Sequence, residues 1–521
     1  MELKNIHQIE EAAQSSSSEV LRLGIAAVFI TVIMIYAGFL TEGVQNSHLL
    51  IAAAVIGAYM AMNIGANDVA NNVGPAVGSR TMTLFGAICI AAIFEAAGAL
   101  VAGGDVVSTI KKGIIDPSLI TDDQTFIWLM MAALLAGALW LNLATYFGMP
   151  VSTTHSIVGG VLGAGLAAGG MDIANWPKMG AIAASWVISP LLGGLIAAAF
   201  LYLIKRTITY QKDMKNAAKK MVPVLISIMA WAFSTYLILK GLKKLWKVDI
   251  LTAAGVGLAI AIAIYLIIRP LIAKKADALP SEKDTVNKLF VIPLICAAAL
   301  LSFAHGANDV ANAVGPLAAI NDSIMSGGIS TKASIPLWVM LVGAVGIAIG
   351  LALYGPKLIR TVGSEITELD QTRAFCIAMA AAITVIIASQ LGLPVSSTHI
   401  AIGAVFGVGF LRETIKANYG EVIGEIKLHH QGKDEAELRS YLDTFEVASF
   451  DEKGRMLHDL KKRSGASVSK KERKELRHEY RKELVKRSAA LKIASAWIIT
   501  VPLSGIMAAL IYFTLRGMLL P

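Results

Sequence analysis

The sequence predicts an all-α polytopic membrane protein with two inverted repeats, broken helices and two re-entrant helical hairpins. Three observations predict this fold. The chain of 521 residues is 55% hydrophobic and 16% charged, with a mean hydropathy of +0.64. It contains many apolar runs of about 18 residues or more, the length that crosses a bilayer. Two polar motifs inside such runs each occur twice.

The first repeated motif is GANDVANNVGP at 65–75, which returns as GANDVANAVGP at 306–316. Its glycines and proline predict helices interrupted near Gly65, Gly74 and Pro75, with freed backbone groups facing a polar cavity. A carboxylate inside an apolar span is costly and normally marks a pathway or an ion site. The polar members are Asn67, Asp68 and Asn71 in the first copy and Asn308, Asp309 and Asn312 in the second.

The second repeated motif interrupts two apolar stretches, 126–170 and 374–410, that are each too long for one span. GMPVSTTHSIVGGVLGAG in the first corresponds to GLPVSSTHIAIGAVFGVG in the second. Because no hydrophilic loop divides either stretch, we expect two helical arms that meet in a tip at membrane depth. Each second arm begins with proline and hydroxyl residues, as helix N-termini do.

Taken in order, the chain divides into six parts. We expect an N-terminal tail at 1–20, an accessory transmembrane helix at 21–43, a first transporter repeat at 49–204, a central transmembrane pair with basic loops at 205–288, a second transporter repeat at 289–410 plus 488–515, and a hydrophilic insertion at 411–487. The number of crossings between equivalent points is odd whether each hairpin counts as none or as two. The repeats are therefore predicted to be inverted.

Three basic hydrophilic segments, 205–220, 269–288 and 412–487, are predicted by the same count to share one side. The positive-inside rule makes that side cytoplasmic, and the N-terminal tail with it, in an inner or plasma membrane. The net charge of +9 thus reports sidedness and not nucleic-acid binding. The basic tail of the insertion is either a regulatory or anionic-lipid contact or a solvated charged helix.

The duplicated residues predict a central site that binds an anion together with cations. Hydroxyls and helix N-termini in the tips suit an oxyanion, but neither tip contains Lys or Arg. Carboxylates and amide oxygens suit small cations, which would offset the charge of the anion. The predicted anion ligands are Asn67, Asn308, Ser152, Thr153, Thr154, Ser396, Ser397 and Thr398, and the predicted cation ligands are Asp68, Asn71, Asp309, Asn312 and Glu95.

Two kinds of residue keep more than one interpretation. His155 and His399 follow the tip hydroxyls and could carry protons or orient the tips. Glu95 lies mid-span in the first half, without an acidic partner in the second, and could be a third cation ligand, a gate or a packing residue. We interpret Cys89, Cys296 and Cys376 as packing residues. We expect no cofactor and no enzymatic activity, since no motif for hydrolytic or transfer chemistry occurs, and the lack of a P-loop argues against nucleotide-driven pumping.

The paired GANDVAN and PVS[ST]TH blocks resemble the inorganic phosphate transporter (PiT) family of cation-coupled phosphate symporters. The resemblance covers about 54–410 and resumes at the last span. It implies phosphate import by alternating access, driven by Na+ or H+, with Asp68 and Asp309 as Na+ ligands. Sulfate or a metal–phosphate complex as substrate, and less readily an anion channel, remain alternatives; a homodimer is left open.

Overall fold

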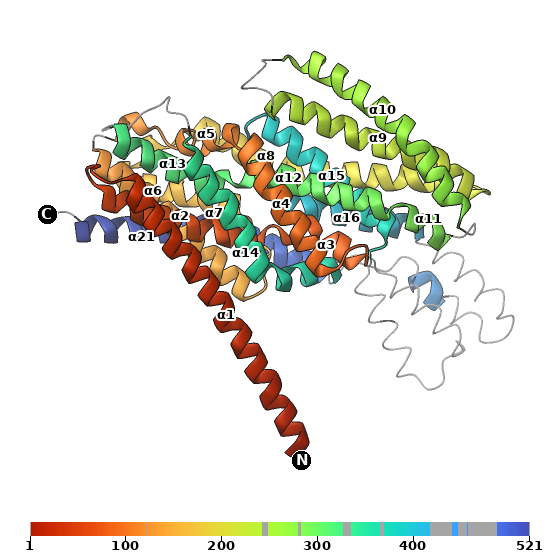
Figure 1. Ribbon diagram of the computed structural model, residues 1–521, viewed down its shortest axis with the longest axis horizontal. Helices are drawn as coiled ribbons and strands as arrows, with labels where there is room; N and C mark the ends of the chain where they lie inside the picture. The colour runs from red at the N-terminus through yellow and green to blue at the C-terminus, as the bar shows by residue number, and fades with distance from the viewer. Residues whose placement is uncertain are drawn as a thin grey trace.

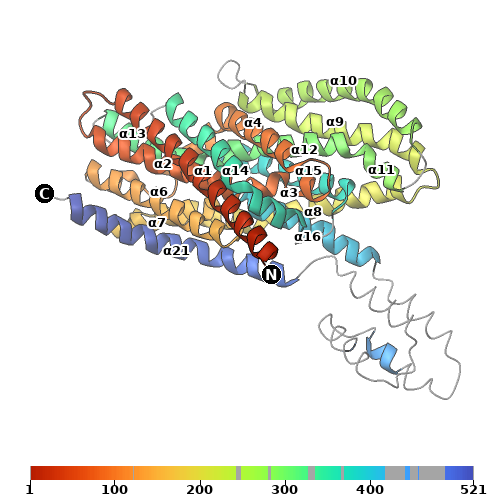
Figure 2. The ribbon, with the colours of Figure 1, turned by 60° about the horizontal axis from the view of Figure 1, so that its bottom comes forward.

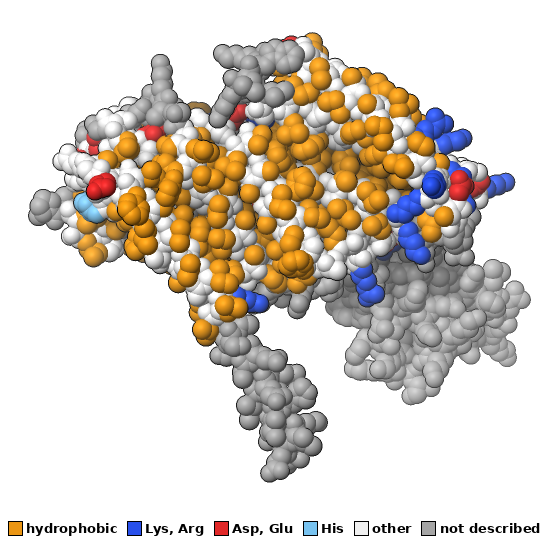
Figure 3. All heavy atoms as spheres, viewed as in Figure 1, with side chains coloured by type: hydrophobic (Ala, Val, Ile, Leu, Met, Phe, Trp, Pro, Cys, Tyr) orange, Lys and Arg blue, Asp and Glu red, His pale blue; other side chains and the backbone are white. Residues whose placement is uncertain are grey.

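The computed structural model describes residues 2–120, 122–241, 248–279, 283–326, 335–364, 369–416, 440–445, 456 and 487–519. Eleven helices in these ranges are long and apolar enough to cross a membrane, which confirms the expected all-α polytopic class. On the face shown in Figure 3, hydrophobic side chains cover most of the described surface and Lys and Arg gather at one end. Most of the predicted insertion at 411–487 lies outside the described residues.

The first half contains α1 (Glu2–Leu40), α2 (Ser47–Asn67), α3 (Ala70–Gly78), α4 (Leu84–Ala102), α5 (Gly104–Lys112), α6 (Asp123–Tyr146), α7 (Thr153–Gly169), α8 (Trp176–Ile204) and the π-helical η3 (Lys205–Thr209). The short helices η1 (Pro117–Leu119) and η2 (Met171–Ile173) flank α6 and α7. The predicted tail at 1–20 thus continues into the first span as one helix.

The remainder contains α9 (Met214–Gly241), α10 (Ile250–Asp277), α11 (Lys283–Leu289), α12 (Val291–Asp309), α13 (Ala311–Ser326), α14 (Leu337–Ser364), α15 (Gln371–Gln390), α16 (Ser397–Lys416) and α21 (Arg487–Leu519). Helices α9 and α10, the predicted central pair, run side by side along one flank of the bundle in Figures 1 and 2. Two polar segments between apolar runs, 104–124 and 357–373, are partly helical, as α5 and the end of α14.

Both copies of the first motif do form broken helices, but the breaks differ from the prediction. They lie at Asp68 and Val69 between α2 and α3, and at Val310 between α12 and α13. Gly65 and Pro75 lie inside helices. The acidic residue therefore sits at each break, and the glycine serves another purpose, which is close packing.

The segment before α6 and the segment after α7 lie side by side. The backbone N–H of Asp116 donates to the carbonyl of Ile173 over 2.8 Å, and Asn175 donates to Ile114 over 3.0 Å. An isolated antiparallel bridge joins Ile115 to Ala174 between these bonds. The helices pack against each other and turn through Gly148, at φ 68°. This geometry supports the predicted re-entrant hairpin.

The pair α15 and α16 has the same turn, at Gly392 with φ 62°. Positive φ is a conformation that glycine adopts at little cost. In the first hairpin Pro150 precedes the N-cap and lies in the extended tip, so it does not open the helix as predicted; α7 begins at Thr153. The proline has no N–H to leave unsatisfied there.

Helices of one half pack against helices of the other half at glycine residues, and the same kind of contact occurs in both halves. In the first, a Cβ at Gly65 of α2 would lie 1.9 Å from the carbonyl oxygen of Ile347 in α14. In the second, a Cβ at Gly306 of α12 would lie 2.1 Å from the carbonyl oxygen of Glu95 in α4. Each motif helix therefore packs on a helix of the other half at backbone distance.

The hairpins also pack against helices of the opposite half at glycine residues. Gly163 of α7 meets Gly505 of α21, where a Cβ would come within 2.2 Å of backbone. Gly407 of α16 meets Gly194 of α8, where the corresponding distance is 2.0 Å. Small residues at helix interfaces allow such approach inside a bilayer, where packing replaces the hydrophobic effect. Each hairpin is thus anchored by the last helix of the opposite half.

The re-entrant hairpin can be tested by labelling. Single cysteines replacing Ser118 and Asp172, before α6 and after α7, should react with a membrane-impermeant maleimide from the same face of the membrane, because the two ends are hydrogen-bonded neighbours. Labelling of these two from opposite faces would contradict a hairpin. A cysteine replacing the exposed tip residue Phe147 should not react from the face opposite to them, and if it does, the pair makes two full crossings and is not re-entrant.

The backbone contacts predict which glycines tolerate a methyl group. Gly65→Ala and Gly306→Ala should each lower the melting temperature of the purified protein, since overpacking costs about 1–3 kcal/mol. Gly255→Ala in α10 is the control, because its Cβ would meet nothing within 4 Å. Equal melting temperatures for all three variants would contradict the contact.

Candidate functional site

The two helix breaks bring Asp68 and Asp309 together at the centre of the protein. Their side chains are almost fully enclosed, with residue exposures of 1% and 0%. One ligand atom from each carboxylate and one from His305 all lie within 4.8 Å of one another. Like charges at this spacing repel strongly where water is excluded, so the cluster requires donors or a cation.

Hydroxyl groups from both hairpin tips supply donors to each carboxylate. Asp68 accepts from Thr153 over 2.6 Å and from Thr398 over 2.5 Å. Asp309 accepts from Ser397 over 2.7 Å, and the hydroxyl of Thr154, which donates to the carbonyl of Val395 over 2.9 Å, lies 3.5 Å from it. The structure therefore places hydroxyls of both tips next to each acid.

The inner asparagines leave acceptors available at this centre. The side-chain N–H2 of Asn71 donates to Thr398 over 2.9 Å, and that of Asn312 donates to Thr153 and Thr154 over 3.0 and 3.2 Å. Their carbonyl oxygens are buried and have no hydrogen-bond partner in the described part of the chain. A small cation would satisfy these oxygens, because hard cations prefer oxygen ligands.

The outer asparagines brace the tips. Asn67 donates to Thr145 over 2.9 Å and accepts from the backbone N–H of Val151 over 3.1 Å. Asn308 donates to the hydroxyl of Ser389 over 2.9 Å. Both were predicted as anion ligands, and the structure places each amide against the loop that carries the hydroxyls.

The first hydroxyl of each tip acts as a helix cap. Ser152 accepts from the backbone N–H of His155 over 3.1 Å, and Ser396 accepts from that of His399 over 3.2 Å. The second and third hydroxyls are those that reach the carboxylates. The remaining first-turn N–H groups of α7 and α16 have no partner within their own helices and can receive an anion.

Glu95 joins the site through a histidine that the sequence analysis did not identify. Nδ1 of His305 lies 2.7 Å from Glu95, and Nε2 lies 2.6 Å from Asp309. The other oxygen of Glu95 accepts from Asn72 over 2.7 Å. The three ionisable side chains are fully buried. Glu95 is therefore connected to the centre through His305.

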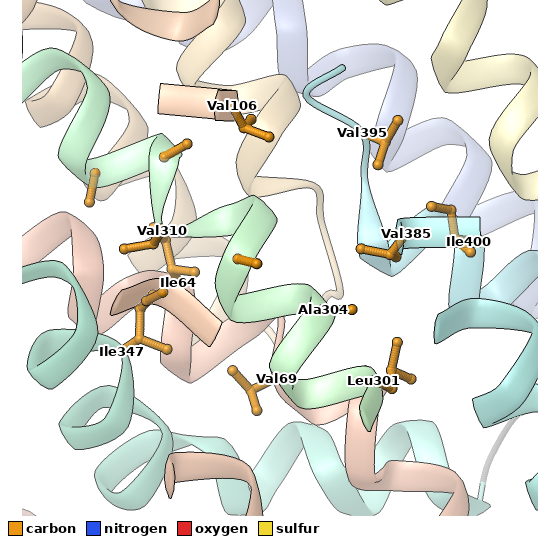
Figure 4. Packing of buried hydrophobic residues seen from close by; sticks show 14 of the residues in the cluster. Ile64, Val69, Val106, Leu301, Ala304, Val310, Ile347, Val385, Val395 and Ile400 are labelled. Atoms are coloured by element: carbon orange, nitrogen blue, oxygen red, sulfur yellow. The ribbon is translucent and has the colours of Figure 1, made fainter. Parts of the chain in front are cut away.

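This connection exists in one half only. Gly65 meets the backbone of Ile347 where Gly306 meets Glu95, so Ile64 and Ile347 are the counterparts of His305 and Glu95. Figure 4 shows these two isoleucines next to each other. At Asn72 the second half has Ala313. The site is thus symmetric in its aspartates and hydroxyls and asymmetric in its third acid.

His155 and His399 lie in a column of aromatic rings. Their ring centroids are 4.4 Å apart; His155 packs on Trp186 at 3.8 Å and His399 on Trp497 at 3.6 Å. Each tip is therefore fixed by a tryptophan of a repeat-ending helix, α8 or α21. This arrangement favours the tip-orienting interpretation over proton carriage.

Sequence reasoning found the aspartates and hydroxyls because they are duplicated. It missed four residues that contact the site. His305, Thr145 and Ser389 lie outside the repeated motifs, and Asn72 has Ala313 in its place in the second copy. The spacing of His305, one helical turn before Asp309, was a usable signal, since residues four apart share a helix face. The three cysteines are free thiols, but only Cys376 is buried; Cys89 is partly buried and Cys296 is exposed, so the expected packing role does not fit Cys296.

Comparison with known proteins gives consistent results. The model of a family described as "Phosphate transporter family" matches residues 64–508. A Helicobacter pylori (strain J99) protein named "Putative phosphate permease" is 52% identical, with 99% of each chain covered. A Haemophilus influenzae protein of the same name is 40% identical over 70% of this chain and 89% of its own. The solved structure titled "The sodium-dependent phosphate transporter" has a TM-score of 0.74 at 31% identity, covering 91% of this chain and 100% of its own.

Proposed function

This chain belongs to the phosphate transporter family, and from that premise we propose that it is a secondary active symporter that imports inorganic phosphate across the inner or plasma membrane. It is a multi-pass membrane protein and a transporter, not an enzyme. The proposal adds a mechanism: coupled cations neutralise Asp68 and Asp309, and phosphate then binds between the two hairpin tips.

The observation that carries the mechanism is the connection of each aspartate to hydroxyls of both tips. Thr398 of one hairpin and Thr153 of the other share the carboxylate of Asp68. A cation at this carboxylate would compete for the same oxygens, so binding changes how both tips are held. Phosphate at the tip N-termini would sense that change through the hydroxyls.

We propose Na+ as the coupling ion. The available ligands are carboxylate, amide and hydroxyl oxygens, which suit a hard cation. The solved relative with 31% identity is described as sodium-dependent, which supports the same ion here. Asp309 already contacts His305, whereas Asp68 has only hydroxyl donors among the side chains of the described residues. Asp68 is therefore the acid with more capacity for a cation.

The aspartates can be tested in proteoliposomes. Asp68→Asn and Asp309→Asn should each reduce gradient-driven uptake of radiolabelled phosphate at least about tenfold, the effect of losing about 1.4 kcal/mol. Asp172→Asn is a matched control, because this aspartate lies exposed between α7 and α8. Full uptake in both site variants would overturn the assignment.

The coupling ion can be tested on the unmodified protein. Replacing external Na+ by choline at fixed pH should abolish concentrative phosphate uptake, because choline is too large to be held by the oxygens at Asp68. If uptake continues and instead follows an imposed pH gradient, the coupling ion is H+ and the Na+ proposal is wrong.

A further inference from the structure

The tip of the second hairpin is held by side chains that donate to its backbone carbonyls from outside the hairpin. Its accepting carbonyls and their donors are Ser389 from Lys240 at 3.3 Å, Gly392 from Thr109 at 2.8 Å, Pro394 from Trp186 at 3.1 Å and Val395 from Thr154 at 2.9 Å. These donors come from α9, α5, α8 and α7. The tip is therefore fixed in place by four separate elements.

Among the side chains that the structure describes, which do not include those of 360–364, the first tip has one such donor, Asn67. The bond from Asn67 to Met149, at 3.1 Å, has its counterpart in the bond from Asn308 to Leu393, at 3.4 Å. The second tip is also bound by α9, a helix of the central pair that lies outside the two repeats.

Lys240 connects this tip to the central helix pair. Its ammonium group forms an ion pair with Asp105 of α5, and its side chain is only 6% exposed. The Ser389 whose carbonyl it approaches also accepts from Asn308, the neighbour of Asp309. Helix α9 packs on α12 through Phe233 and Phe303, whose ring centroids are 5.3 Å apart. Lys240 is therefore connected through Ser389 to Asn308, which precedes Asp309 in the chain.

We propose that Lys240, Asp105 and Thr109 form a latch that holds the second hairpin closed on the outer side of the binding site. They are positioning residues, since none touches the aspartates. This inference rests on the proposed transport function and gives the central helix pair a role in it. A charged side chain bridging α5, α9 and the tip must release its partners before the tip can separate from α5.

The face that the latch closes follows from charge. The basic segments 205–220 and 269–288 lie at the opposite ends of α9 and α10 from Lys240, and the positive-inside rule makes those ends cytoplasmic. Asp105, Thr109 and Lys240 thus face the outside. With the latch formed, phosphate cannot enter from that face, and breaking the latch should favour the outward-open state.

The experiment measures both kinetic constants of Na+-driven phosphate uptake in right-side-out proteoliposomes. Lys240→Met and Thr109→Val should each lower the KM for external phosphate about fivefold, because a larger fraction of carriers faces outward. The kcat should fall as well, because closing that face becomes harder. The conservative variant Lys240→Arg should keep both constants near those of the unmodified protein, since a guanidinium group can still pair with Asp105 and donate to the carbonyl of Ser389.

The matched control is Lys219→Met, which removes an exposed ion pair with Asp277, 2.5 Å long, at the other end of the same helix pair. Unchanged constants in Lys240→Met and Thr109→Val would overturn the latch. So would a loss of folded protein with an unaltered KM, which is the sign of a purely structural role. If the unmodified protein transports no phosphate, the proposed function fails instead.

Discussion

Two carboxylates enclosed near each other in an apolar protein are the constraint on which the rest of this structure depends. Asp68 and Asp309 cannot both stay ionised there without donors or cations. Hydroxyls from two hairpin tips donate hydrogen bonds to these carboxylates, and unpartnered amide oxygens beside them can bind a cation. Because these groups come from four different chain segments, the helices must break and the hairpins must stop at the same depth.

The glycine contacts are the packing consequence of that requirement. Each motif helix approaches a helix of the other half at backbone distance, and each hairpin is held by the last helix of the other half. Neither half can build its part of the site alone. This mutual dependence explains how one cation at Asp68 could influence both hairpins, since Thr153 and Thr398 share its carboxylate.

The deviations from symmetry carry the information about direction and coupling. The pair Glu95 and His305 replaces two isoleucines, and Lys240 connects the second tip to the central helix pair, which lies outside the repeats. An inverted repeat with identical halves would have equal energies facing in and out. Such differences are the means by which one chain can bias the two states.

The sequence alone determined the membrane class, the duplicated motifs and most of the site, because an acid or hydroxyl repeated within apolar spans is costly and therefore informative. It did not locate the helix breaks. Gly65 was predicted to interrupt the helix, but it lies inside α2 and allows close packing on α14. It could not show that each aspartate reaches both tips, or that His305 joins Glu95 to Asp309. Those facts depend on which helices of the two halves pack together, and only the tertiary structure decides that.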